Sequence, residues 1–189
     1  FIGVYLTAVG GLPILLLGLA SLICAFAYTA GPFPLAYLGL GDIFVIAFFG
    51  LGAVCGTYFL NLGRVGLGAV LAGFAVGCLA TAILVVNNLR DALSDAKVEK
   101  RTLIVRFGDR FGRIEHAVLL LLPYVFIAYG LVSDALPLGA GLVLLSAPLA
   151  LREIHLLKTL QGAQLNPRLG GAARLEFVFC LCFSVGCLL

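Results

Sequence analysis

Six long apolar runs constrain the fold of this chain more than any other feature of its sequence. A helix needs about 20 apolar residues to cross the hydrocarbon core of a bilayer. The runs are continuous and show no two-residue alternation, which argues against membrane strands. We therefore predict an all-α, polytopic transmembrane helical bundle with about six spans. The predicted spans cover roughly residues 3–27, 42–61, 66–88, 114–132, 136–152 and 172–189.

The composition of the chain excludes a soluble enzyme. Of its 189 residues, 62% are hydrophobic and 11% are charged, whereas a soluble domain has about 45–50% apolar and about 25% charged residues. A soluble chain of this length could not remove so much apolar surface from water. We therefore expect the apolar side chains to face membrane lipid, and residues 1–189 to form a single membrane domain.

The basic residues indicate how the spans are oriented. All Lys and Arg residues except Arg64 lie in the segments 89–113 and 152–174, which six spans place on the same side of the membrane. Positive residues gather on the cytoplasmic side. We therefore expect a multi-pass protein of the cell (inner) membrane with its polar site facing the cytoplasm. Because acidic residues are interleaved with these cations and spans flank them, we expect no nucleic-acid partner.

A polar constellation lies at the end of the third apolar run. Asn87, Asp91 and Asp95 are spaced i, i+4 and i+8, so a helix presents them on one face. Asn88 comes three residues before Asp91. Oxygen ligands at this spacing suit Mg²⁺, which keeps water and phosphate oxygens as its remaining ligands. The sequence therefore makes Asp91 and Asp95 candidate ligands of a magnesium ion.

Basic residues directly follow these carboxylates. Lys97, Lys100 and Arg101 come after the polar face, and cations beside a carboxylate-bound Mg²⁺ suit a diphosphate because together they neutralise a leaving group. A simpler interpretation is an interfacial anchor or a solvated turn, in which Asp91 pairs with Arg90 or Lys97. The spacing alone leaves both interpretations open.

The same residues resemble a motif of a known family. The pattern Asn87-Asn88-Leu89-Arg90-Asp91-x-x-x-Asp95, followed by Lys100-Arg101-Thr102-Leu103-x-Val105-Arg106-x-Gly108, is similar to the second aspartate motif of the UbiA-type membrane prenyltransferases. Three further stretches resemble, within that family, the subgroup that acts on 1,4-dihydroxy-2-naphthoate. They are Tyr28-Thr29-x-Gly31-Pro32-x-Pro34-Leu35-x-Tyr37-x-Gly39-Leu40-Gly41-Asp42, then Phe44-Val45-x-x-Phe48-Phe49-Gly50 with Val54-x-Gly56-Thr57-Tyr58, and Leu165-Asn166-Pro167.

The resemblance implies a fold and an activity. The fold would have nine membrane helices around a central cavity, of which this chain would supply the last six, the C-terminal two-thirds of the domain. The activity would be Mg²⁺-dependent transfer of a polyprenyl group from polyprenyl diphosphate to 1,4-dihydroxy-2-naphthoate, with release of CO₂ and diphosphate, in menaquinone biosynthesis. The allylic diphosphate would ionise first, and the electron-rich ring would then attack the carbocation.

The resemblance also assigns roles to residues. Asp91 and Asp95 would hold Mg²⁺, Asn87 and Asn88 would support them, and Lys100 and Arg101 would contact phosphate oxygens. The expected substrate-binding residues are Tyr28, Arg90, Lys97 and Arg106. For Tyr28 the alternative is interfacial anchoring, which is common for Tyr, and for Arg106 it is contact with lipid headgroups.

Two departures from the family pattern matter. A first Asn/Asp-rich motif, which the family carries on an earlier helix, is absent from this sequence, so we expect the chain as given to be truncated at its start and inactive alone. Glu99 stands where the family usually has Gly, which adds a carboxylate near the expected phosphate site.

Other functions stay open at this point. A prenyltransferase for 4-hydroxybenzoate or homogentisate would share the aspartate motif, although the loop from Tyr28 to Asp42 favours the naphthoate subgroup. A cation-coupled transporter fragment is the alternative of another class. A transporter predicts ionisable residues deep within several spans, whereas the charges here gather near the ends of the predicted spans.

Overall fold

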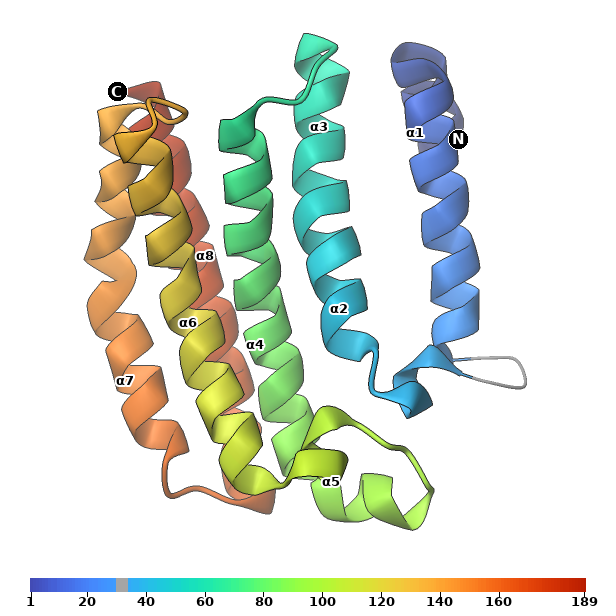
Figure 1. The fold of residues 1–189 in the computed structure, drawn as a ribbon, viewed down its shortest axis with the longest axis vertical. Helices are drawn as coiled ribbons and strands as arrows, with labels where there is room; N and C mark the ends of the chain where they lie inside the picture. Colours follow the sequence, from blue (N-terminus) through green and yellow to red (C-terminus); the bar gives the residue numbers. More distant parts are fainter. Residues whose placement is uncertain (30–33) are drawn as a thin grey trace.

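The computed structural model describes residues 1–29 and 34–189, and every regular element in these ranges is helical (Figure 1). Gly31 and Pro32 of the loop motif lie outside the described residues. The described ranges contain six helical segments that are long and apolar enough to cross a membrane. The prediction of an all-α bundle with about six spans is therefore confirmed.

The elements follow one another from the N-terminus, and η2 is a π-helix whereas the other η elements are 3₁₀-helices. They are α1 (Ile2–Thr29), η1 (Leu35–Leu38), α2 (Gly41–Val45), η2 (Ile46–Gly52), α3 (Ala53–Leu62), α4 (Leu67–Lys97), α5 (Leu103–Phe107), α6 (Asp109–Val132), η3 (Leu138–Ser146), α7 (Ala147–Leu157), η4 (Gly162–Leu165) and α8 (Asn166–Leu188). The segment from α2 to α3 forms one span, η3 and α7 form another, and η4 and α8 form the last.

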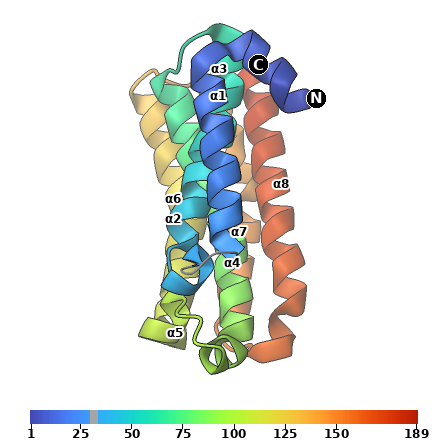
Figure 2. The ribbon, with the colours of Figure 1, turned by 90° about the vertical axis from the view of Figure 1, so that its right-hand side faces the viewer.

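Helix α4 is the centre of the bundle. It packs against α6 and α8 on one side and against η2 on the other (Figures 1 and 2). Its contact with η2 depends on small residues, because a Cβ on Gly50 would lie 2.6 Å from the Cα of Gly77. Small residues let membrane helices approach closely. The backbone of α4 is thereby fixed from both sides.

Helix α4 also runs nine residues past the end that the apolar run predicted. Leu89, Ala92, Leu93 and Ala96 favour a helix, and no Gly or Pro interrupts the chain before Lys97, where the helix ends. Consequently the polar constellation lies on a single helix, as its spacing predicted.

The two charged segments meet at one end of the bundle. The connections from α4 through α5 to α6, and from α7 to α8, all lie at the lower end of Figure 1, whereas Arg64 lies in the turn between α3 and α4 at the other end. The lower end is called the charged end below. That segments 89–113 and 152–174 share one side is confirmed, and which side faces the cytoplasm stays a prediction.

Candidate active site

Arg90 connects the polar residues of α4 to the start of α8. Its guanidinium donates from Nε to Asp91 Oδ1 at 2.7 Å and from Nη2 to Asp91 Oδ2 at 2.6 Å. The same Nη2 donates to Asn87 Oδ1 at 2.7 Å, and Nη1 donates to Asn166 Oδ1 at 3.2 Å. The predicted pairing of Asp91 with Arg90 is confirmed, and the role of this pair stays a prediction. The Arg90 and Asp91 side chains are 25% and 31% exposed, so a ligand can still reach them.

The second carboxylate, Asp95, pairs with Lys100. The Lys100 Nζ lies 2.9 Å from Asp95 Oδ2, and the Asp95 side chain is only 11% exposed. The Lys100 backbone N–H also donates to the Asp95 carbonyl at 2.9 Å. A tight turn after α4 thus holds one ammonium group beside one carboxylate, and Asp95 also lies within electrostatic range of Arg90.

Tyr28, at the end of α1, lies against the start of α2 and near the same turn. Its hydroxyl lies against Gly41, since a Cβ on that glycine would be 3.1 Å from Tyr28 Oη. Tyr28 is within electrostatic range of both Lys100 and Asp42. The structure therefore brings the first loop and the basic turn together, although 72 positions separate Tyr28 from Lys100.

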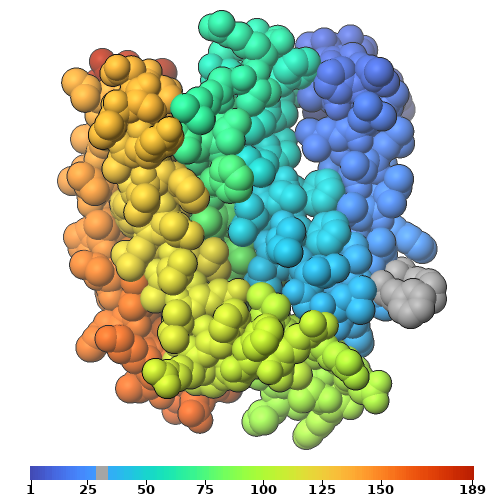
Figure 3. Space-filling view, viewed as in Figure 1, coloured from blue at the N-terminus to red at the C-terminus, as the bar shows by residue number. Residues whose placement is uncertain are grey.

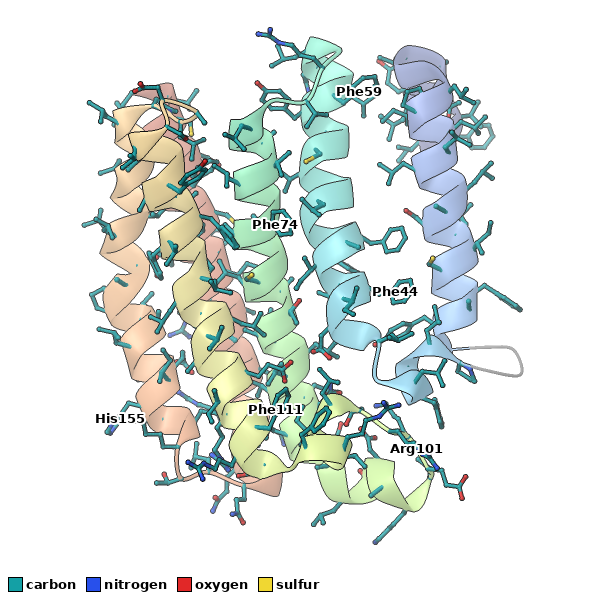
Figure 4. The ribbon with its side chains drawn as sticks, viewed as in Figure 1. Phe44, Phe59, Phe74, Arg101, Phe111 and His155 are labelled. Atoms are coloured by element: carbon teal, nitrogen blue, oxygen red, sulfur yellow. The ribbon has the colours of Figure 1, made fainter. Side chains whose placement is uncertain are left out.

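The remaining predicted site residues occupy different environments. Asn88 is buried, with 4% of its surface exposed, whereas Asn87 is only partly buried. Lys97 and Arg101 are exposed at the charged end, where Figure 4 labels Arg101 near α5. Arg106 donates from Nε to the Arg101 carbonyl and from Nη2 to the Leu38 carbonyl. Their roles toward a substrate stay predictions.

A cavity of about 670 Å³ adjoins this site between α1 and the span from α2 to α3 (Figure 3). Its walls are almost entirely apolar, and Tyr28 lines it at the charged end. The other lining residues are Ser21, Cys24, Ala25, Phe44, Val45, Phe48, Phe49 and Ala53. The arrangement joins a polar, charge-rich mouth to an apolar space.

The carboxylates of Asp91 and Asp95 suit a magnesium ion whose remaining ligands come from a substrate phosphate. Within the described residues, no group of three or more His, Cys, Asp and Glu side chains could hold a metal ion. Mg²⁺ in phosphate-handling sites is bound by one or two carboxylates together with substrate phosphates, and Asp91 and Asp95 supply that number. Arg90 donates one hydrogen bond to each Asp91 carboxylate oxygen, so each oxygen keeps a second lone pair that could bind another ligand.

Comparison with known proteins identifies the class of protein that carries this site. The model of the UbiA prenyltransferase family matches residues 1–175, so the chain belongs to the UbiA prenyltransferase family. It is 37% identical over 174 residues to the 1,4-dihydroxy-2-naphthoate octaprenyltransferase of Haemophilus influenzae, covering 92% of this chain and 56% of that protein. The Escherichia coli protein of the same name is 36% identical over 173 residues, covering 91% and 56% of the two chains. The chain thus spans little more than half the length of these curated relatives.

Sequence reasoning missed several buried polar groups. Asp42 opens α2 as expected, but it is only 7% exposed and its Oδ1 has no hydrogen-bond partner in the described structure. Glu115 Oε2 and both ring nitrogens of His116 are likewise buried atoms with no hydrogen-bond partner in the described structure. The available signal was that these ionisable residues stand in the first positions of the predicted spans 42–61 and 114–132. Asn166 was missed for another reason, because its contact with Arg90 spans 76 positions.

Glu99 adopts a backbone conformation that favours glycine. Its φ is +56°, which costs a residue with a side chain about 1 kcal/mol or more. We expect Glu99→Gly to raise the free energy of unfolding by about 0.5–1 kcal/mol. Thermal unfolding in detergent micelles measures the effect. Glu99→Gln is the matched control, because it removes the charge and keeps the strain; equal stability of both variants would contradict the backbone explanation.

Proposed function

We propose that the protein transfers a polyprenyl group from polyprenyl diphosphate to 1,4-dihydroxy-2-naphthoate, with release of CO₂ and diphosphate. The observation that supports this most is the pairing of two carboxylates and a basic turn at one mouth of an apolar, membrane-spanning bundle. The names of the two bacterial relatives support the choice of acceptor. The proposed setting is the cell membrane, with the charged end facing the cytoplasm, where a water-soluble acceptor is available.

We infer the following roles, which the contacts at the charged end support. Asp91 and Asp95 hold Mg²⁺, and Asn87 fixes the Arg90 guanidinium beside Asp91. Lys100 and Arg101 bind diphosphate oxygens, and Lys97 adds positive charge at the same mouth. Asn88 supports the site from within the bundle, and Tyr28 borders both the diphosphate and the apolar cavity.

The proposed reaction uses these residues for electrostatics and positioning. Mg²⁺, when bound, neutralises the negative charge that grows on the diphosphate as its bond to the allylic carbon breaks. Lys100 and Arg101 stabilise the same charge by direct contact. The apolar walls around Phe44 and Phe48 keep water from the allylic carbocation until the aromatic ring attacks it.

The direct test uses membranes that carry the product of the whole gene. Labelled polyprenyl diphosphate and Mg²⁺ are supplied with either 1,4-dihydroxy-2-naphthoate or 4-hydroxybenzoate. We expect prenylated product from the naphthoate alone, and we expect a chelator to abolish it. Membranes from cells without the gene are the control.

Each other outcome points elsewhere. Product from 4-hydroxybenzoate alone would keep the family activity and overturn the proposed acceptor. Product that persists with the chelator would overturn the metal assignment. Absence of product from both acceptors would contradict this reaction and favour another acceptor or the transport of a cation through the bundle.

A further inference from the structure

Two segments far apart in the sequence are fastened to each other beside the proposed diphosphate site. The first is η1 with Gly39 and Leu40, and the second is the turn of residues 98–102 that follows α4. The Arg101 backbone N–H donates to the Tyr37 carbonyl at 3.0 Å. The Arg106 guanidinium donates from Nη2 to the Leu38 carbonyl at 2.8 Å and from Nε to the Arg101 carbonyl at 3.0 Å. One arginine therefore bridges both segments.

Gly39 lets the two segments come this close. Its φ is +72°, in the region that favours glycine. A Cβ at this position would lie 2.7 Å from the Arg101 carbonyl oxygen and 3.5 Å from Arg106 Nε. Both the backbone conformation and the available space therefore require glycine where the bridge forms.

The backbone of Arg106 is itself held in place. Thr102 caps α5, because its hydroxyl accepts a hydrogen bond from the Val105 N–H and its carbonyl accepts one from the Arg106 N–H at 3.0 Å. The planar guanidinium presents several donors in a fixed fork, which suits two carbonyls on different segments. A lysine ammonium is a point charge on a flexible stem and lacks this fork.

The bridge involves the backbone of Arg101, one of the proposed phosphate ligands. Both backbone polar groups of Arg101 are used in it, the N–H toward Tyr37 and the carbonyl toward Arg106. The start of the same turn is tied to the last turn of α4, because the Val98 and Lys100 N–H groups both donate to the Asp95 carbonyl, at 3.2 and 2.9 Å. The turn is thus held at both ends, and the exposed Arg101 side chain projects from a fixed backbone.

We propose that Arg106 is a positioning residue that fastens residues 35–40 across the turn 98–102 and thereby orients Lys100 and Arg101 toward the diphosphate. Its role is exerted through backbone carbonyls and not by direct contact with phosphate. The effect on diphosphate binding rests on the proposed function, whereas the closure, meaning the contact that Arg106 makes between residues 35–40 and 98–102, does not.

The kinetic test compares variants in membranes that carry the product of the whole gene. We expect Arg106→Ala and Gly39→Ala each to raise the KM for polyprenyl diphosphate about tenfold, with kcat reduced less than threefold. Because both changes break the same contact, we expect the double variant to be no worse than either single one. Arg106→Lys should have a KM close to that of Arg106→Ala, because a lysine ammonium lacks the fork of donors. Arg110→Ala, which replaces an exposed arginine in the first turn of α6, is the matched control and should leave KM within twofold.

A second measurement tests the closure without any activity. Cleavage by trypsin needs local opening of the backbone, so the bond after Arg101 should be protected while the bridge is intact. We expect cleavage at this bond, followed by mass spectrometry in detergent micelles, to be at least tenfold faster in Arg106→Ala and in Gly39→Ala. Cleavage after Arg64, at the other end of the bundle, should not change and serves as the internal control.

The two measurements separate the two proposals. Faster cleavage without prenyl transfer in any variant, the unaltered protein included, would overturn the proposed function and keep the bridge. Unchanged cleavage after Arg101 would overturn the bridge. A large loss of kcat at unchanged KM in Arg106→Ala alone would overturn the positioning role and indicate direct contact with the reacting phosphate.

Discussion

Replacing Asp91 or Asp95 with asparagine is expected to lower kcat for prenyl transfer by about a thousandfold. Each substitution removes one of the two carboxylates proposed to hold Mg²⁺, and an amide oxygen carries no net charge to replace it. The cations at the mouth of the site remain, so polyprenyl diphosphate should still bind. We therefore expect the KM for the diphosphate to change much less than kcat.

The resting contacts of the two aspartates predict a difference between the variants. Asp91→Asn leaves Arg90 without its bidentate partner, although Asn87 and Asn166 still accept from it. The freed guanidinium can bind the diphosphate, which would lower the KM in this variant. Asp95→Asn removes the partner of Lys100 in a pair that is largely buried, and breaking a buried pair leaves an uncompensated charge. We expect this variant to lose stability as well as activity.

The matched control is Asp134→Asn, at the opposite end of the bundle. This residue has a φ of +53°, a region that asparagine adopts readily. The same chemical change should therefore leave transfer and thermal stability unaltered. The test of the two proposed metal ligands is the initial rate of prenyl transfer over a range of Mg²⁺ concentrations, in membranes with the whole gene product. Activity above a tenth of the unaltered protein's in both Asp91→Asn and Asp95→Asn would contradict the proposed metal ligands.

The parts of the molecule that sequence predicted well depend on local spacing. Asn87, Asp91 and Asp95 share one face of α4 because they are spaced four residues apart. The six spans were predictable from the length of the apolar runs. The family assignment was also accessible, since the aspartate motif and the basic turn are contiguous. Each of these features is decided within a few turns of the chain.

The parts that sequence did not predict depend on tertiary contacts. The bond from Arg90 to Asn166 joins helices that are neighbours only in the folded bundle. The contacts of the Arg106 guanidinium with the Leu38 and Arg101 carbonyls were not predictable from the sequence either, because Leu38 lies 68 positions away. The role of Arg106 in substrate binding stays a prediction. The same limit applies to η2 and η3, where packing favours a π-helix and a 3₁₀-helix inside apolar runs that indicate only a helix.

Replacing Gly186 with alanine is expected to lower the free energy of unfolding by about 2 kcal/mol or more. Gly186 lies on α8 against Gly139 of η3, where the two backbones meet directly. A Cβ on Gly186 would lie 2.5 Å from the Gly139 carbonyl carbon and 3.1 Å from the Ala140 amide nitrogen. Backbone atoms cannot rotate aside as a side chain can, so η3 and α8 would have to separate and lose the packing between two spans.

Gly170→Ala is the matched control for this prediction because it is the same chemical change on the same helix. No atom lies within 4 Å of a Cβ at Gly170, and alanine favours a helix over glycine by about 1 kcal/mol. The two variants should therefore shift stability in opposite directions, which thermal unfolding in detergent micelles measures directly. The sign of each change in the free energy of unfolding is more informative than its size, since helix propensity alone would make both variants more stable than the unaltered protein. If Gly186→Ala were stabilised like Gly170→Ala, η3 and α8 would not be in backbone contact.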